Sequence, residues 1–228
     1  MEQDKIWEAY QNDASLVGGC WPSGGRYSYL AKQVPVGARA LNIGVGNGTL
    51  ERLLVQKGVQ VSCLDPSNAA IERLRDELDL GENAQAGYSQ AIPFPDDSFD
   101  VLIMSEVLEH LDEDTLGETL NEVMRVLRPA GRFVGTVPAD ENLADSLVVC
   151  PHCAEKFHRW GHVQSFSKER LVSVLGTVFS QVEAKRVALH DYQQLNWKGK
   201  ILAAVTEAQA AADIKGSNQN FYFEACGS

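Results

Sequence analysis

Three glycines at alternate positions predict a loop that binds a nucleotide-like ligand. Gly44, Gly46 and Gly48 follow an apolar segment and precede an amphipathic one. Glycines permit positive φ and close approach to the backbone, beside the positive end of the following helix. Thr49 stands where a dinucleotide fingerprint needs Gly or Ala, but Asp65, 21 positions after Gly44, can accept both hydroxyls of an adenosine ribose. The alternative is a tight turn followed by a solvated Asp.

A second group combines carboxylates with an imidazole. Glu106, Glu109 and His110 follow the strongly apolar segment 99–104. If a helical turn begins there, the three side chains share one face. This set of oxygen and nitrogen ligands suits Mg²⁺, Mn²⁺, Fe²⁺ or Zn²⁺. The alternative is an acidic helix N-terminus, where the glutamates stabilise the helix through its dipole. His110 would then close a pocket that holds no metal.

A third group lies in a long segment without periodicity. Cys150, Cys153, His158 and His162 have the spacing C-x₂-C-x₄-H-x₃-H, which is close to that of a zinc knuckle. A structural zinc held by Cys150, Cys153 and His158, with His152 as a fourth ligand, would order the segment. His162 cannot serve this site and the glutamate group together. In the alternative, the thiols are free and aromatic side chains pack the segment onto the sheet.

The elements that position these groups alternate between strands and helices. Short apolar runs separated by amphipathic stretches indicate an α/β fold with a parallel sheet. Ser67 caps one helix, Gly58 ends another, and Pro129-Ala-Gly131 stops a third. The expected strands are 38–43, 59–64, 84–88, 99–104, 132–137, 181–189 and 220–225, and the expected helices include 49–57, 112–127, 168–175 and 200–212.

Length and composition limit the class of protein. The 228 residues suit one domain, 1–228, and the net charge of −11 disfavours binding of nucleic acid by phosphate neutralisation. The apolar runs fall far short of the roughly 20 residues that a membrane span needs. Because the polar N-terminus lacks a signal-peptide core, we expect a cytoplasmic protein whose cysteines are thiols or metal ligands.

Four motifs together resemble those of the class I S-adenosylmethionine-dependent methyltransferases. They are Asn42-Ile-Gly-Val-Gly-Asn-Gly48, Asp65-Pro-Ser67, Ile92-Pro-Phe-Pro-Asp-Asp-Ser-Phe-Asp100 and Leu127-Arg-Pro-Ala-Gly131. The resemblance spans roughly residues 38–137. It implies a Rossmann-like, seven-stranded sheet with helices on both faces, with residues 138–166 as a Cys/His insert after strand five. The N-terminal segment 1–36 is then a lid over the cleft or a helix packed on the sheet.

The same resemblance implies where S-adenosylmethionine binds. Asn42 stands where relatives usually have an acidic residue, so it keeps hydrogen bonds to the methionine end without the charge. Tyr88 stands near the position where relatives often carry an Asp that contacts the adenine. The resemblance therefore assigns the adenine contact in this chain to Ser89 or Gln90. The implied cofactor-binding residues are Asn42, Gly44, Val45, Gly46, Gly48, Asp65, Pro66, Ser89, Gln90 and Ser105.

The segment Glu106-Val-Leu-Glu-His110 resembles the E-x-x-E-H segment of two O-methyltransferase groups, which act in ubiquinone biosynthesis and on the terminal ribose of small RNAs. The ubiquinone group also has a later His four residues before a Phe, which nominates His162 as a fourth ligand before Phe166. The resemblance implies methyl transfer to a hydroxyl of a small molecule or glycan, with Glu106, Glu109, His110 and His162 as the catalytic and metal-binding set. Three alternatives stay open: a metal-free enzyme with a His general base, a cofactor-binding module without catalysis, and a methyltransferase for a terminal ribose of RNA.

Overall fold

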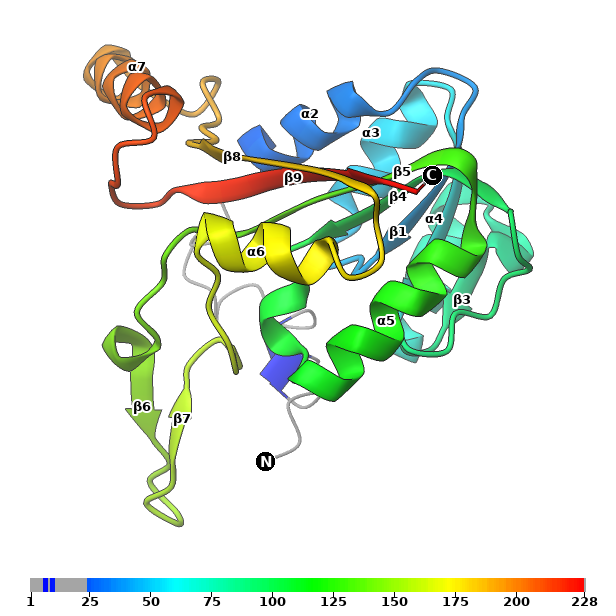
Figure 1. The fold of residues 1–228 in the computed structure, drawn as a ribbon, viewed down its shortest axis with the longest axis horizontal. Helices are drawn as coiled ribbons and strands as arrows, with labels where there is room; N and C mark the ends of the chain where they lie inside the picture. The colour runs from blue at the N-terminus through cyan, green and yellow to red at the C-terminus, as the bar shows by residue number, and fades with distance from the viewer. Residues whose placement is uncertain (1–5, 8, 11–23, 228) are drawn as a thin grey trace.

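The structure is a computed structural model that describes residues 6–7, 9–10 and 24–227. One sheet of seven strands forms its centre (Figure 1). β1, β2, β3, β4 and β5 are parallel, and β9 runs antiparallel to both of its neighbours. Across the sheet the order is β3 (Ala84–Ala86), β2 (Gln60–Asp65), β1 (Arg39–Ile43), β4 (Phe99–Ser105), β5 (Leu127–Pro138), β9 (Asn220–Cys226) and β8 (Gln181–Val187).

Helices cover both faces of this sheet, as predicted. α2 (Gly24–Gln33), α3 (Thr49–Gln56) and α4 (Asn68–Leu78) bury one apolar layer against it, which includes Leu30, Leu54 and Leu74. α5 (Glu113–Val126) and α6 (Lys168–Leu175) bury the other layer. Side-chain oxygens of Ser67, Asp112 and Ser167 accept backbone N–H groups at the starts of α4, α5 and α6. Such caps satisfy orphan donors and fix where each helix begins.

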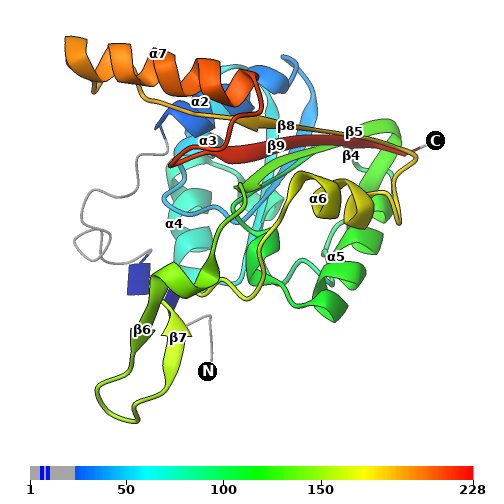
Figure 2. The ribbon, with the colours of Figure 1, turned by 60° about the vertical axis from the view of Figure 1, so that its left-hand side comes forward.

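The segment between β5 and α6 forms a small sheet of its own. β6 (Leu147–Val149) and β7 (Lys156–His158) pair as an antiparallel hairpin that projects from the main body (Figure 2). The described chain before α6 also contains three short 3₁₀ turns: Gly81–Asn83, Leu108–His110 and Leu143–Ser146. The sequence predicted this insert as irregular, because three-residue strands are too short to show a pattern of alternation.

The last elements lie at one edge of the main sheet. α7 (Trp197–Ala211) packs on the edge strand β8, and β9 returns between β8 and β5. In the described part of the chain, no helix has both the length and the apolar character that crossing a bilayer requires.

Candidate active site

A cleft of about 1210 Å³ opens at the carboxyl ends of β1, β2 and β4. Ligands bind at this edge in open parallel sheets. The cleft brings together most of the predicted cofactor residues and three of the four predicted catalytic residues. From the first set it is lined by Gly44, Gly46, Asp65, Pro66, Ser89, Gln90 and Ser105, and from the second by Glu106, His110 and His162.

The glycine loop and Asp65 hold each other in place. Gly44 and Gly46 have φ values of 86° and 51°, in the left-handed region that favours glycine. Asp65 Oδ2 accepts the backbone N–H of Val45 at 2.9 Å, and Oδ1 accepts that of Ser67 at 2.8 Å. These two bonds orient a buried carboxylate at the end of β2, where it lines the cleft.

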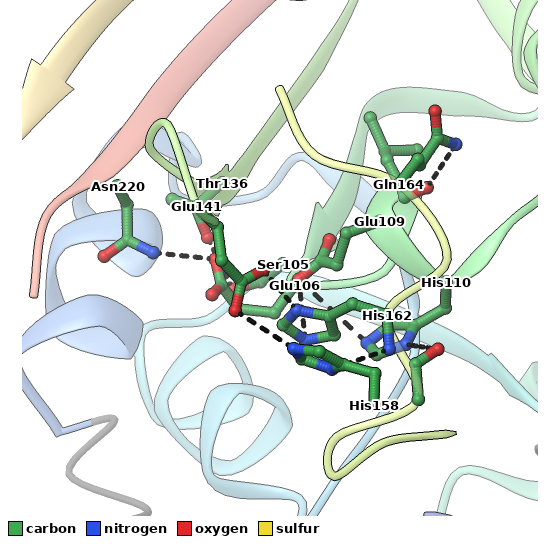
Figure 3. Close-up of polar contacts among 12 residues, drawn as sticks. Ser105, Glu106, Glu109, His110, Thr136, Glu141, His158, His162, Gln164 and Asn220 are labelled. Atoms are coloured by element: carbon green, nitrogen blue, oxygen red, sulfur yellow. Dashed lines mark hydrogen bonds and ion pairs between the residues drawn. The ribbon is translucent and has the colours of Figure 1, made fainter. Parts of the chain in front are cut away.

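Two serines that line the cleft are fixed by threonines from other elements. Ser89 Oγ lies 2.8 Å from Thr119 Oγ1 on α5. Ser105 Oγ lies 2.9 Å from Thr136 Oγ1 on β5, and Figure 3 labels both of these residues. Both hydroxyls can therefore donate or accept within the protein. Both serines line the cleft together with Gln90.

Asn42, Val45 and Gly48 lie behind the cleft rather than in its lining, which differs from the prediction for them. Val45 is buried and contributes its backbone N–H to Asp65. Gly48 caps α3 with φ 81°, and a Cβ at this position would lie 2.4 Å from Leu74 Cδ2. The third glycine is therefore needed for the close packing of α3 against α4.

Alanine at position 48 is expected to destabilise the fold more than alanine at position 58. Gly58 has the same φ of 81°, but a Cβ there meets Val36 Cγ1 at an ordinary 3.6 Å. Both variants carry the cost of a left-handed residue, while Gly48→Ala adds overpacking of about 2 kcal/mol. Urea unfolding of the two variants measures the difference. Equal destabilisation would show that Leu74 moves aside freely.

Asn42 pairs with a buried glutamate from α3. Asn42 Nδ2 donates to Glu51 Oε1 at 2.6 Å, and both residues are at most 2% exposed. Desolvation by burial raises the pKa of Glu51 from 4.5 to about 7, against the hydrogen bond from Asn42 that lowers it. The chain thus places an acid beside Asn42, nine positions later in the sequence.

Glu51→Gln is expected to stabilise the protein above neutral pH. Because the folded pKa lies above the unfolded one, the native state favours the protonated acid, and this contribution is lost as pH rises through about 7. Ionisation of Glu51 in the folded state lowers the free energy of unfolding by about 3 kcal/mol. The amide of Glu51→Gln fits imperfectly, so it should recover about 2 kcal/mol of this at pH 8. Urea unfolding at pH 5 and 8 should show a gain that grows with pH, while the exposed control Glu82→Gln shows none. A gain independent of pH would contradict the assignment.

Five acidic and imidazole side chains meet beside the cofactor half of the cleft (Figure 3). Two overlapping groups bring potential ligand atoms within 4.8 Å of one another: Glu109, His110 and His162, and Glu141, His158 and His162. Glu109 is fully buried, and neither of its carboxylate oxygens has a hydrogen-bond partner among the described residues. The Nε2 atoms of His110 and His162 each lie 4.0 Å from Glu109 Oε1. The prediction that His162 joins Glu109 and His110 therefore agrees with the geometry.

Glu106 does not join this cluster, contrary to the prediction of a helical face. Its backbone has φ 58°, and the 3₁₀ turn begins only at Leu108. The left-handed residue breaks the i, i+3, i+4 relation, so the side chain points toward β9 and α2. There Glu106 Oε1 accepts Asn220 Nδ2 at 3.0 Å, and Oε2 lies 3.7 Å from Arg26 Nη1.

The predicted zinc site of Cys150, Cys153 and His158 is not assembled. Cys150 and Cys153 lie in the turn at the tip of the β6–β7 hairpin, and Cys153 and His152 are exposed. His158 pairs with Leu147 at the opposite end of the hairpin and is buried in the cluster. Among the described residues, no group of three potential ligands includes either cysteine. The hairpin register separates ligands that are close in the sequence.

Sequence reasoning missed Glu141 and Arg26. Glu141 follows β5 and lies 2.5 Å from His162 Nδ1 and 3.5 Å from His158 Nε2. Arg26, on α2, lines the cleft and adds a cation opposite Glu106. Glu141 could have been found because a residue just after β5 must lie at the same sheet edge as Glu106. Arg26 carries no such signal, since the helix that holds it precedes the first strand.

The N-terminal segment contributes to the same place. Trp7 lines the cleft with its ring 4.5 Å from that of His110, and Tyr10 Oη donates to the Arg159 carbonyl at 2.9 Å. Tyr27 also lines the cleft, from α2, whereas Trp21 lies outside the described residues.

Desolvation by burial, followed by the charge of His162, lowers the pKa of His110 to about 3. His110 is thus a neutral imidazole and a weak base.

Comparisons with known proteins agree with this geometry. Residues 41–135, which hold the glycine loop and the segment 105–110, match a family described as methyltransferase domain. Residues 41–135 are therefore similar to methyltransferase domains, as the four sequence motifs predict. The order β3-β2-β1-β4-β5 places the glycine loop at the switch point of the sheet, beside β4.

Proteins similar to this chain include enzymes for different acceptor atoms. It is 36% identical over 108 residues to a ubiquinone/menaquinone biosynthesis C-methyltransferase of Vibrio vulnificus, covering 43% of this chain and 40% of that protein. It is 33% identical over 124 residues to a ubiquinone biosynthesis O-methyltransferase of Xylella fastidiosa, covering 49% and 47%. The chain spans about half the length of the curated relatives that it matches.

A solved structure shares the fold over almost the whole chain. The 1,6-didemethyltoxoflavin-N1-methyltransferase of Burkholderia thailandensis, solved with 1,6-didemethyltoxoflavin and S-adenosylhomocysteine, has a TM-score of 0.67 and 16% identity. The match covers 99% of this chain and 87% of that one. The insert and the last strands therefore belong to one recurring architecture.

Proposed function

We propose that this protein transfers a methyl group from S-adenosylmethionine to a hydroxyl of a small molecule or glycan. The observation that supports this function best is the single cleft that joins the glycine loop to the Glu109, His110 and His162 cluster. In the proposed complex Gly44 and Gly46 lie along the methionine end, Asp65 holds the ribose, and Ser89 and Gln90 contact the adenine. Ser105 then lies below the sulfonium. The cleft volume of about 1210 Å³ leaves room for an acceptor beside the cofactor.

The donor set of the cluster fits a divalent metal such as Mg²⁺, Mn²⁺, Fe²⁺ or Zn²⁺. Glu109 offers two buried oxygens without hydrogen-bond partners among the described residues, and His110 Nε2 is buried in the same condition. Ligand atoms about 2 Å from one ion lie about 3–4 Å apart, and the two imidazoles lie 4.0 Å from Glu109. A bound metal would lower the pKa of a coordinated hydroxyl and orient it.

The residues of the chain supply mainly orientation. Holding nucleophile and methyl group in line can lower the barrier by roughly 7–11 kcal/mol without any covalent step. Glu109 is buried, and the half-buried imidazoles of His110 and His162 line the acceptor side, which is bounded by Trp7 from segment 1–36 and by the insert 138–166. A metal-free reaction would rest on His162, because the low pKa of His110 makes that imidazole a poor base.

Product analysis with isotopically labelled S-adenosylmethionine tests the proposal. We expect transfer to acceptors with two adjacent oxygens, such as catechols, in preference to acceptors with one hydroxyl, since a metal can grip the pair. Addition of a chelator should lower the rate, and divalent metal should restore it. Transfer to carbon would instead favour the activity of the C-methyltransferase relative. Binding of S-adenosylhomocysteine without turnover over a broad panel would favour a module without catalysis.

A further inference from the structure

The three imidazoles of the cluster differ in which ring nitrogen carries the proton, because each has a different fixed partner. His110 Nδ1 lies 3.2 Å from the carbonyl oxygen of Gly161. A carbonyl oxygen only accepts hydrogen bonds, so the proton of His110 is on Nδ1. The lone pair of Nε2 then faces Glu109 Oε1 at 4.0 Å.

His162 has the same tautomer for a different reason. Its Nδ1 lies 2.5 Å from Glu141 Oε2, and an ionised carboxylate also only accepts. The proton of His162 is therefore on Nδ1, and the Nε2 lone pair faces Glu109 Oε1 at 4.0 Å. An imidazole that donates from one nitrogen to a carboxylate is a more basic, better-oriented metal ligand through the other.

His158 has the opposite tautomer. Its Nδ1 accepts the backbone N–H of His162 at 3.1 Å, so its proton is on Nε2. Nε2 lies 3.5 Å from Glu141 Oε1, on the oxygen that His162 does not use. His158 could bind a metal through Nε2 only by losing that proton. Its ring also stacks on His162, with centroids 4.5 Å apart.

We propose that Glu141 and His158 are positioning residues that sort these tautomers, so that a metal meets lone pairs from Glu109, His110 and His162 alone. Glu141 Oε2 accepts the Nδ1 proton of His162, while His158 Nε2 lies 3.5 Å from Glu141 Oε1, at ion-pair distance and without a hydrogen bond. The inference rests on the proposed function for the metal, but the tautomers are properties of the chain itself. In this proposal Glu106 is not a metal ligand, because its carboxylate faces Asn220 and Arg26. The second potential ligand group, Glu141, His158 and His162, is then a support and not a second metal site.

Titration of the purified protein with Mn²⁺ by calorimetry tests the ligand assignment. Glu141→Ala is expected to weaken binding by about 10–100-fold, as loss of a partner of a metal ligand does elsewhere. Glu141→Gln should recover part of this loss, because an amide oxygen still accepts from Nδ1. Glu106→Gln is the matched control, as a carboxylate that lines the same cleft, and should change affinity much less. Equal losses in Glu106→Gln and Glu141→Ala would overturn the proposal.

The tautomers are measured separately by nitrogen-resolved NMR of the metal-free protein. We expect Nδ1–H for His110 and His162 and Nε2–H for His158, and mixed tautomers for His162 in Glu141→Ala. Unchanged affinity for S-adenosylhomocysteine in the variant shows that the fold is intact. A His162 tautomer that does not respond to Glu141→Ala would overturn the proposal. Absence of Mn²⁺ binding with the expected tautomers would remove the metal from the proposed function and leave the sorting by Glu141 supported.

Discussion

Asp65→Ala is expected to weaken the binding of S-adenosylhomocysteine by at least about 100-fold. The carboxylate accepts the N–H groups of Val45 and Ser67, so its loss frees both loops in addition to removing the proposed ribose contact. Hydrogen bonds to a charged group contribute about 1.5–3 kcal/mol each, and loss of two contacts accounts for the expected factor. Isothermal titration calorimetry measures the affinity directly and needs no acceptor.

The matched control is Glu72→Ala, which removes a carboxylate from the exposed rim of the same cleft. We expect little change in affinity for this variant. Thermal unfolding shows whether Asp65→Ala keeps its fold. A folded Asp65→Ala variant with the affinity of the natural protein would exclude Asp65 from ribose recognition.

Glu109→Gln is expected to weaken Mn²⁺ binding at the proposed site and, at the same time, to stabilise the protein at neutral pH. Burial, followed by the charge of Glu106, raises the pKa of Glu109 well above its ordinary value. The fold therefore favours the protonated acid, and the stability that this contributes is lost as pH rises through the folded pKa. An amide avoids this cost but removes the charge that a cation needs. Mn²⁺ affinity should fall by more than the about 10–100-fold expected for a supporting residue.

Opposite effects on binding and stability distinguish this role from a structural one. A buried residue that serves only packing should lose stability when it is changed. Glu113→Gln, at an exposed site at the start of α5, is expected to change neither property strongly. If Glu109→Gln binds Mn²⁺ as the natural protein does, the cluster does not hold a metal through Glu109.

Most of the parallel sheet could be predicted because its signals are local. Ser67 and Asp112 mark helix starts within a few residues of their observed place, and the buried strands are continuous apolar runs. The sequence does not decide whether the segment that contains α2 forms a lid or a helix packed on the sheet. The apolar face of α2 is weak, and the helix begins with Gly24 and Gly25. The β6–β7 hairpin was missed because three-residue strands show no period.

The two halves of the cleft differ in how well they could be predicted. On the cofactor side, contacts such as Asp65 to Val45 follow from strand ends that meet at one edge. On the acceptor side, one left-handed residue, Glu106, decides which carboxylates meet, and no composition rule predicts a positive φ at glutamate. In the structure Glu141, and not Glu106, lies beside His162, because the end of β5 brings Glu141 to this edge of the sheet.

The separate pairing of β6 with β7 has a consequence for how an acceptor enters. The hairpin has its own hydrogen-bond ladder and shares none with the seven-stranded sheet. His158 lies on this hairpin, whereas Asp65 and the glycine loop lie at the ends of strands of the main sheet. A change in the hairpin is therefore expected to alter the acceptor side of the cleft more than the glycine loop. Amide hydrogen exchange should be faster in 147–158 than in β1 or β4, whatever acceptor the cleft accommodates.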